Sequence, residues 1–418
     1  MNRLRLVVLI VMALCRGAMG QIVVPGADGS DGVFNPTGNV VVNLALAPTG
    51  VWDGPNAQPG QGVYDPQKWA VVFRYSSINI PAGVTVSFSN HPAFAPVVWL
   101  VSGNVTINGT ISLNGQNGST SPNVLPVPGP GGFHGARVFQ SAQSVASAGR
   151  GPGGGPYSGS GSGPNVGGSH GTQGSGGGAG STYGNASVLP LMGGSGGSPG
   201  VGSGLGCNGE SVGGGAGGGS ILIATQNTTS ISGLINALGG NPPSSCSGAG
   251  GSGGAIRIIS DVVSGTGGLR ARGGIAAISP GGAGRIRVEG NSITLSDPGN
   301  PAFSPGVAGA TAVIWPATSA PSIVISSVGG QPVPVDPRAS LDFGSQDVGL
   351  NNPNPVTVQI QATNVPTSWS MVVRVVPKQG AAQNVNATRI SGGFASSIWE
   401  ASLSLPNGFS NMQVRASQ

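Results

Sequence analysis

The sequence predicts an all-β protein in which a parallel β-helix (a solenoid), carrying a long Gly-rich insertion, is followed by a C-terminal β-sandwich. The first observation behind this is a repeated pattern of alternating aliphatic residues between glycines. Its copies are Gly109-x-Ile111-x-Leu113-x-Gly115, Gly233-x-Ile235-x-Ala237-x-Gly239 and Gly267-x-Leu269-x-Ala271-x-Gly273. Repeats of this kind are typical of stacked coils that bury an aliphatic face only against their neighbours. The second observation is a change of composition after residue 321, where glycine becomes sparse.

Residues 1–20 have the features of a secretory signal peptide. Arg3 and Arg5 precede an apolar segment that runs from Leu6 to Leu14, and Ala18-Met19-Gly20 is a small-x-small cleavage site. The apolar segment is too short to span a bilayer. We therefore expect a secreted or cell-surface protein whose mature chain begins at Gln21 and contains no transmembrane span.

The β-helix is expected to cover residues 71–316, behind a turn-rich N-terminal cap at residues 21–70. Ile78, Ile80, Val84, Val86 and Phe88 alternate with polar residues, which is the period of a half-buried strand. In the cap, Asp28, Asp31 and Asp53 precede or follow turn residues. They could bind calcium, but Asp-Gly turn chemistry is the preferred explanation.

Residues 115–219 form the Gly-rich insertion, and they account for many of the 79 glycines of the chain. Two alternatives fit this composition. The segment is disordered, or its backbone packs closely against the helix, which glycine alone permits. Because loop closure depends weakly on length, removing residues between Gly151 and Gly204 is expected to cost little stability.

The C-terminal residues 322–418 are predicted to form an immunoglobulin-like β-sandwich. Seven short runs with strand character follow one another at regular spacing from Ile323 to Ala416, and one of them is Ala339–Phe343. The segment lacks the paired cysteines of antibody domains, so only the architecture is predicted.

Charge and cysteine content restrict the partners of the protein. Cleavage after Gly20 leaves 14 of the 17 basic residues against 12 acidic ones, and no basic run is interleaved with aromatics, so no nucleic-acid partner is expected. Cys207 and Cys246 are the cysteines of the mature chain, and an oxidising compartment favours a disulfide between them over two free thiols. No Cys-x-x-Cys motif or nearby histidine pair indicates a metal site, and no cofactor is expected.

The arginines of the repeats are the strongest candidates for a ligand-binding site. Arginines fall at outward positions between inward aliphatic residues. When the two Gly-Gly-Ala segments are aligned, Arg257 lies in register with Arg285. Ile286 then lies in register with Ile258 and Ile223. The candidate residues are Arg257, Arg270, Arg272, Arg285 and Arg287. A column of guanidinium groups could bind anionic polysaccharide bidentately. Alternatively, these arginines keep a charge-poor surface soluble and pair with Asp261 and Glu289.

A polysaccharide lyase or hydrolase remains a further alternative, because such enzymes need clustered carboxylates. Asp261, Glu289 and Asp297 are the acids of the regular part, and no two of them are paired in sequence. The histidines His91, His134 and His170 are isolated and are expected to lie at the surface or in loops. No catalytic residue is assigned.

The coil motifs resemble those of Gly-rich secreted bacterial proteins that are right-handed parallel β-helices. The resemblance is carried by Ile78-Asn79-Ile80-Pro81-Ala82-Gly83, Val105-x-Ile107-Asn108-Gly109, Gly253-Gly254-Ala255-Ile256-Arg257-Ile258 and Gly281-Gly282-Ala283-Gly284-Arg285-Ile286. It implies a bacterial exported protein and covers about residues 25–300. Residues 322–418 resemble sandwich modules appended to bacterial surface proteins. The leading hypothesis is an exported, non-enzymatic surface protein with a structural or adhesive role, in contact with cell-surface components.

Overall fold

The computed structural model describes residues 21–50, 60–138, 146–157, 165–201, 211–243, 248–338, 346–351 and 354–418. Within these residues the fold is all-β, as predicted, apart from the short 3-10 turn η1 (Leu44–Leu46). The strands are β1 (Gly32–Phe34), β2 (Val40–Asn43), β3 (Val63–Asp65), β4 (Ala70–Ile80), β5 (Thr85–Ser89), β6 (Val97–Val101), β7 (Val105–Ile107), β8 (Thr110–Ser112), β9 (Gly200–Val201), β10 (Ser211–Val212), β11 (Ser220–Thr225), β12 (Thr228–Ile231), β13 (Leu234–Asn236), β14 (Ala255–Gly265), β15 (Gly268–Arg270), β16 (Arg285–Leu295), β17 (Ser304–Gly306), β18 (Ser322–Val328), β19 (Gln331–Pro332), β20 (Val356–Thr363), β21 (Ser370–Pro377), β22 (Gln383–Gly392), β23 (Ser396–Leu403) and β24 (Ser410–Ser417).

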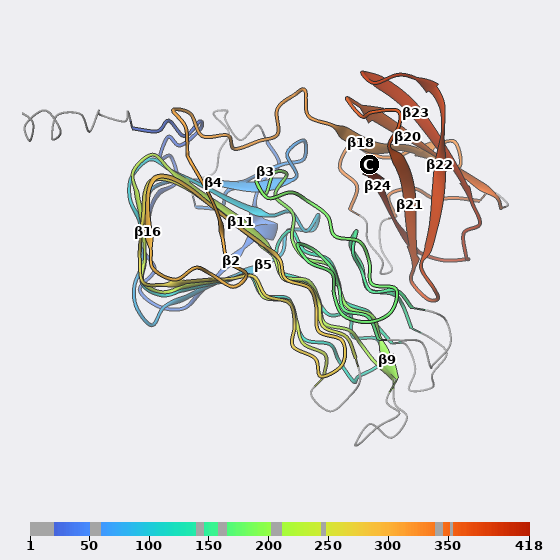
Figure 1. Ribbon diagram of the computed structural model, residues 1–418, viewed down its shortest axis with the longest axis horizontal. Helices are drawn as coiled ribbons and strands as arrows, with labels where there is room; N and C mark the ends of the chain where they lie inside the picture. Colours follow the sequence, from blue (N-terminus) through green and yellow to red (C-terminus); the bar gives the residue numbers. More distant parts are fainter. Residues whose placement is uncertain are drawn as a thin grey trace, which may run out of the picture.

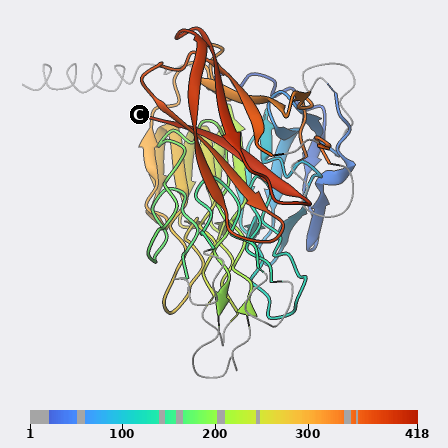
Figure 2. The ribbon, with the colours of Figure 1, turned by 90° about the vertical axis from the view of Figure 1, so that its right-hand side faces the viewer.

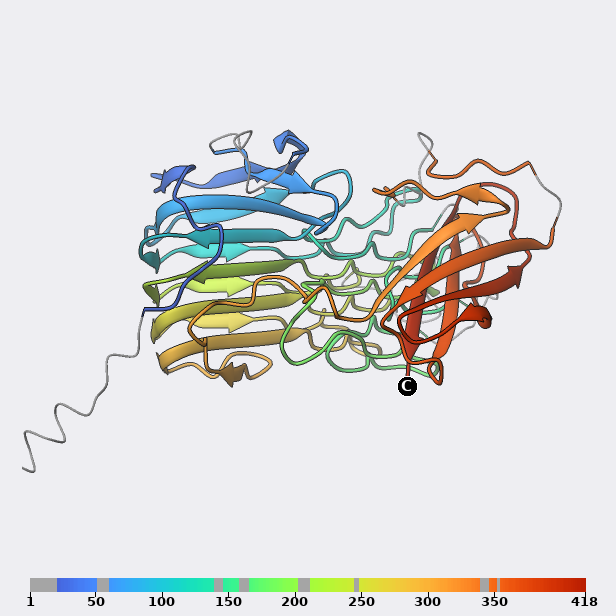
Figure 3. The ribbon, with the colours of Figure 1, turned by 90° about the horizontal axis from the view of Figure 1, so that it is seen from above.

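Most strands before residue 300 lie in parallel stacks, one above the other (Figure 3). Strands β9 and β10 instead pair with each other in an antiparallel sheet of two strands. The first stack is β4, β6, β11, β14 and β16, in that order. The long strands β4, β14 and β16 bend, and their second halves form a second stack with β7 and β12. The third stack is β2, β5, β8, β13 and β15. Strands β1 and β3 lie along the edge of β4, β1 parallel to it and β3 antiparallel.

The register of the last layer differs from the sequence alignment by two residues. Ile258 of β14 pairs with Val288 of β16, not with Ile286, and Arg257 pairs with Arg287, not with Arg285. A shift of two residues keeps every side chain on its own face of the sheet, so the period of two could not detect it. In the observed register Gly284 lies against Gly254, where an added Cβ would be 1.9 Å from the Gly254 carbonyl oxygen.

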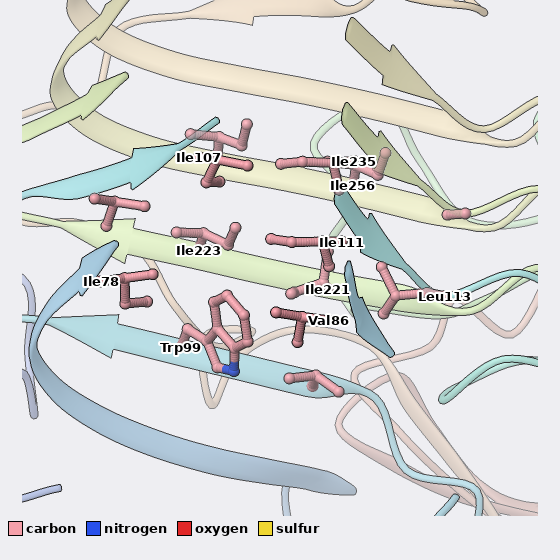
Figure 4. Close-up of a cluster of buried hydrophobic side chains, with 14 of the residues drawn as sticks. Ile78, Val86, Trp99, Ile107, Ile111, Leu113, Ile221, Ile223, Ile235 and Ile256 are labelled. Atoms are coloured by element: carbon pink, nitrogen blue, oxygen red, sulfur yellow. The ribbon is translucent and has the colours of Figure 1, made fainter. Parts of the chain in front are cut away.

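A single aliphatic core fills the space between the stacks (Figure 4). Side chains from all three stacks point into it, and neighbouring layers place similar residues above one another. Trp99, Ile107, Ile111, Ile221, Ile223, Ile235 and Ile256 are all fully buried members. Near the N-terminal end the core is aromatic, since Phe34 stacks on Tyr75 with ring centroids 5.1 Å apart. Burial of this contiguous apolar surface is the main source of stability in this half of the chain.

The outer face of the first stack is buried as well. The segments around Ile22 and Ile314 run across it and are joined by a parallel bridge between Val23 and Thr311. They cover the outward residues of β6 and β11, such as Leu100 and Leu222. A strand that is covered on both faces needs apolar residues at every position, which explains the unbroken run Val97–Val101.

The described residues of the Gly-rich insertion form a folded layer that continues the stacks sideways (Figure 1). Its segment 213–219 shows the principle, because its backbone N–H groups point to three neighbours in turn. Residues 213, 216 and 219 donate to carbonyls of 113–119, residues 214 and 217 donate to 133–136, and residues 215 and 218 donate to 249–252. This period of three is that of polyproline II geometry, in which a chain makes no internal hydrogen bonds and bonds only to its surroundings.

Side chains are excluded from this layer by the closeness of its backbones. A Cβ on Gly217 would lie 1.8 Å from the carbonyl oxygen of Gly194, and one on Gly253 would lie 1.7 Å from that of Ala271. Of the two alternatives left by the composition, the described residues therefore show close backbone packing. Removing residues between Gly151 and Gly204 is therefore expected to lower the stability, contrary to the expectation from loop length. The removal would break backbone hydrogen bonds to four neighbouring segments of the chain.

Residues 322–418 form an antiparallel sheet of strand order β19-β18-β20-β23-β22-β21-β24, closed around its own apolar core (Figure 2). The predicted run Ala339–Phe343 lies outside the described residues. This sheet contacts the Gly-rich layer through Arg374, whose guanidinium donates to the carbonyl oxygens of Gly149, Gly151 and Gly154 at 3.0–3.3 Å. Val376 packs beside it against Val138 and the neighbouring alanines of the layer.

Candidate functional site

The arginines predicted to bind a ligand lie on the last two layers of the first and third stacks, where the register sets their neighbours. Arg257 in β14 and Arg287 in β16 are adjacent and share one carboxylate, that of Glu289. The Arg257 Nε and Nη2 atoms each lie 3.0 Å from Glu289 Oε1, and Arg287 Nε lies 3.2 Å from the same oxygen. Two guanidinium groups and one carboxylate leave this cluster with a net positive charge.

Arg257 is buried, with only 2% of its surface exposed, although the sequence placed it at an outward position. The outer face of the first stack is covered, so a residue that points outward there is not in solvent. Desolvation lowers the pKa of the Arg257 guanidinium, and the Glu289 charge opposes that shift. Its Nη1 atom has no hydrogen-bond partner among the described residues.

The remaining arginines are half-buried and do not form one continuous column. Arg270 makes a bidentate pair with Asp297, at 3.1 and 2.6 Å, which raises the pKa of the guanidinium and lowers that of the carboxyl. Arg285 donates from Nε and Nη2 to the carbonyl oxygen of Tyr183. For Arg272, the described part of the chain shows no side-chain partner. The structure thus brings Arg257 and Arg287 together and leaves Arg270, Arg272 and Arg285 in separate surroundings.

Each acidic residue of the last layers of the stacks accepts a hydrogen bond from a side chain. Glu289 accepts from the two arginines, Asp297 from Arg270, and Asp261 from the Asn291 side-chain amide at 2.7 Å. Among the described residues no group of three or more His, Cys, Asp or Glu side chains could hold a metal ion. The ion pairs of Glu289 with Arg257 and Arg287 are those that the alternative interpretation of the arginines predicted. Asp261 pairs with an amide instead.

Two of the histidines, which were predicted to be surface or loop residues, lie in loops but not at the surface. His91 and His170 are buried, and each stacks on a tyrosine ring: His91 on Tyr64 at 3.9 Å and His170 on Tyr183 at 4.6 Å. Burial lowers the pKa of both imidazoles to about 4, so both are neutral at pH 7. The flat imidazole packs on an aromatic face because, once neutral, it costs little to desolvate.

A polar cluster around Tyr183 was not predicted. The Tyr183 hydroxyl donates to the carbonyl oxygen of Gly193 at 2.6 Å and accepts from the Ser195 hydroxyl at 3.0 Å. His170 Nδ1 lies 2.9 Å from the carbonyl oxygen of Gly253 and is therefore the protonated nitrogen. The serine's partner is a tyrosine hydroxyl and not the imidazole, so the cluster lacks the base that would activate a nucleophile. It ties the side chains of the segment 169–195 to the glycine backbone.

The described aspartates of the N-terminal cap accept hydrogen bonds from backbone N–H groups. The carboxylate of Asp28 accepts from the backbone N–H of Ser30 and pairs with Arg74 at 2.9 Å, and Asp31 accepts from the backbone N–H groups of Gly60 and Arg74. Asp28 thus shows the turn chemistry expected from the sequence, whereas Asp31 joins segments that are distant in sequence. Asp53, together with Cys207, Cys246 and residues 1–20, lies outside the described residues.

Comparisons with family models, with curated proteins and with solved structures gave no match to the chain. In the part of the chain that the structure describes, no helix is long and apolar enough to cross a membrane. The functional argument therefore depends on the geometry above.

Proposed function

We propose that the chain is an exported, non-enzymatic surface protein with a structural or adhesive role. In this proposal the parallel stacks are the coils of a β-helix, and residues 322–418 are an immunoglobulin-like sandwich carried at its side. The signal-peptide features of residues 1–20 and the likeness of the coil motifs to Gly-rich secreted bacterial proteins support export.

The observation that carries the proposal is the way the Gly-rich layer is built. It is held by backbone hydrogen bonds in several directions and offers few side chains for chemistry. A rigid layer of this kind suits a scaffold. The C-terminal sheet is fixed to it by Arg374, a buried arginine whose three carbonyl partners come from one turn, Gly149–Gly154. Buried polar contacts of this kind favour this arrangement of the two parts, since moving the sheet away would leave the Arg374 cation buried without these partners.

Fractionation of the host that expresses the full chain tests the proposal. The mature protein is expected outside the cytoplasm, beginning at or near Gln21, and a knockout is expected to change cell adhesion or envelope integrity. An intact Met1 on cytosolic protein contradicts export. Mass spectrometry of the exported chain also tests the proposed Cys207–Cys246 disulfide, which two free thiols would exclude.

Binding of anionic polysaccharide is a second candidate function, favoured by the charge of the Arg257, Arg287 and Glu289 cluster and by Arg272, which has no described partner. Titration with polygalacturonate tests it. Arg272→Ala combined with Arg287→Ala is expected to weaken binding, with a steep salt dependence, whereas Arg389→Ala on the C-terminal sheet serves as the control. Unchanged affinity in the double variant would exclude Arg272 and Arg287 as binding residues.

A further inference from the structure

A groove of about 410 Å³ opens where the third stack meets the Gly-rich layer. Its walls are the segment after β5, the segment after β8 and the chain around Pro128. The volume lies within the range of about 300–1,000 Å³ that is usual for small-ligand sites. Nothing in the preceding argument for a scaffold uses these residues.

An amide in the wall of the groove is only half satisfied. Asn90 Nδ2 donates to the carbonyl oxygen of Pro128 at 2.8 Å, but Asn90 Oδ1 is buried and has no partner in the described part of the chain. The amide cannot be turned over, because Oδ1 would then face the Pro128 oxygen. A buried acceptor without a donor is unfavourable, and a ligand hydroxyl that reached Asn90 Oδ1 would relieve that cost.

Two further amides border the groove and have donors to spare. Asn114 Oδ1 accepts from the backbone N–H of Leu238, and Gln116 Oε1 accepts from that of Val127. Both oxygens are thus occupied, while both side chains are exposed and the described residues offer no partner to the amide nitrogens. The groove is therefore bordered by amide N–H donors, and the buried Asn90 Oδ1 lies in one of its lining residues.

A phenylalanine is held at the groove in an unfavourable backbone conformation. Phe94 has φ of 51°, in the left-handed region that bulky residues avoid. Its backbone N–H donates to His91 O at 2.8 Å, its carbonyl oxygen accepts from Gly131 at 2.7 Å, and its ring meets His134 edge-on at 4.7 Å. Strain that the surroundings impose in this way is concentrated at ligand-binding positions.

The groove carries no charged side chain. Among the described residues its lining contains no Asp, Glu, Lys or Arg, and the titratable residue found there, His91, is neutral at pH 7. A charged ligand would lose its hydration here without gaining an ion pair, which excludes acidic sugars and phosphates as favoured ligands. Aromatic and proline surface beside amides matches a molecule that has an apolar ring face and hydroxyl groups around its edge.

We propose that this groove binds a neutral saccharide, with Phe94 and Pro92 against the apolar face of a sugar ring and the amides of Asn90, Asn114 and Gln116 at its hydroxyl groups. The proposal does not depend on the scaffold role. Export and adhesion can fail while the groove still binds sugar, and the reverse also holds.

Isothermal titration calorimetry of the full chain with maltotriose, cellotriose and laminaritriose tests the proposal, with trigalacturonate as the charged counterpart. At least one neutral trisaccharide is expected to bind, and trigalacturonate more weakly. Phe94→Ala is expected to weaken binding about tenfold or more, and Gln116→Ala about fivefold. The matched controls are Phe394→Ala and Gln67→Ala, which alter exposed residues away from the groove.

Gln116→Ala keeps the test decisive if Phe94→Ala lowers thermal stability, because Gln116 is exposed. Three results would overturn the proposal. The first is no binding of any neutral trisaccharide, the second is binding that neither groove variant changes, and the third is stronger binding of trigalacturonate or of a proline-rich tripeptide than of the neutral sugars.

Discussion

Replacing Gly217 by alanine tests the central feature of the fold, the close packing of the Gly-rich layer. Gly217 lies in the middle of the segment whose N–H groups point to three neighbours. Its N–H donates to Phe133 O at 2.9 Å, and its carbonyl oxygen accepts from Gly129. The added Cβ would lie 1.8 Å from the carbonyl oxygen of Gly194 and 2.3 Å from its carbonyl carbon.

The cost follows from these distances. Real Cβ atoms do not approach other heavy atoms closer than 3.0 Å, so the two backbones must separate by at least 1.2 Å. The bond from Gly194 N to Gly218 O, at 2.8 Å, joins these two backbones and does not survive that displacement. The bonds that hold Gly217 and Gly194 to Phe133, at 2.9 and 3.0 Å, are weakened when either backbone moves. Two or three buried bonds at about 1 kcal/mol each, together with the strain of overpacking, give a destabilisation of about 3–5 kcal/mol.

Chemical denaturation of the purified protein, followed by circular dichroism, measures the effect. Gly38→Ala and Gly393→Ala are the controls, because a Cβ at either position meets nothing within 4 Å and neither residue has a positive φ. Both are expected to be neutral or slightly stabilising, by up to about 1 kcal/mol. If Gly217→Ala unfolds at the same denaturant concentration as these controls, the glycines are not packed as described and the reasoning fails.

Further predictions concern the aliphatic core, the buried arginine and a histidine. Ile258→Ala removes a fully buried side chain between two layers and is expected to cost about 2–5 kcal/mol in thermal unfolding. Arg257→Ala is expected to lower the stability by about 2–4 kcal/mol, because it removes one of the two partners of the buried Glu289 carboxylate. Arg272→Ala is expected to lower it by less than about 1 kcal/mol. Equal values for the two variants would refute the burial argument. His170 stays neutral in the native state down to about pH 4 but takes up a proton near 6.5 when unfolded, so its contribution is complete above pH 6.5 and declines between pH 6.5 and 4. A flatter stability profile over that range is expected for His170→Gln, and an unchanged slope would contradict it.

The all-β class could be predicted from the sequence because alternation with a period of two is a local property. Each inward aliphatic residue of the repeats, such as Ile235 and Leu269, is buried in the structure. The alternation also located most strands of the C-terminal sheet. Alternation could not fix the register of β16, because Ile286 and Val288 both face inward. They differ only in the residue of β14 with which each of them pairs.

The groove could not be predicted, because its walls come from segments that are separated in sequence. Asn90 and Gln116 share no sequence motif. The sequence around Phe94 also does not predict that its backbone adopts a left-handed conformation. The buried His170 cluster was missed for the same reason, as its partners Tyr183 and Gly253 lie on different passes of the chain.

The sequence by itself determined which residues enter the core of the stacks, because side-chain direction in a strand follows from position alone. It also limited the Gly-rich segments to two behaviours, but it could not choose between them. Tertiary structure made that choice, since a chain without side chains is ordered only when neighbouring backbones accept its hydrogen bonds. It likewise decided the surroundings of the arginines. Arg257 points outward as its position requires, yet the segments around Ile22 and Ile314 cover that face, and a residue's exposure depends on what lies above it.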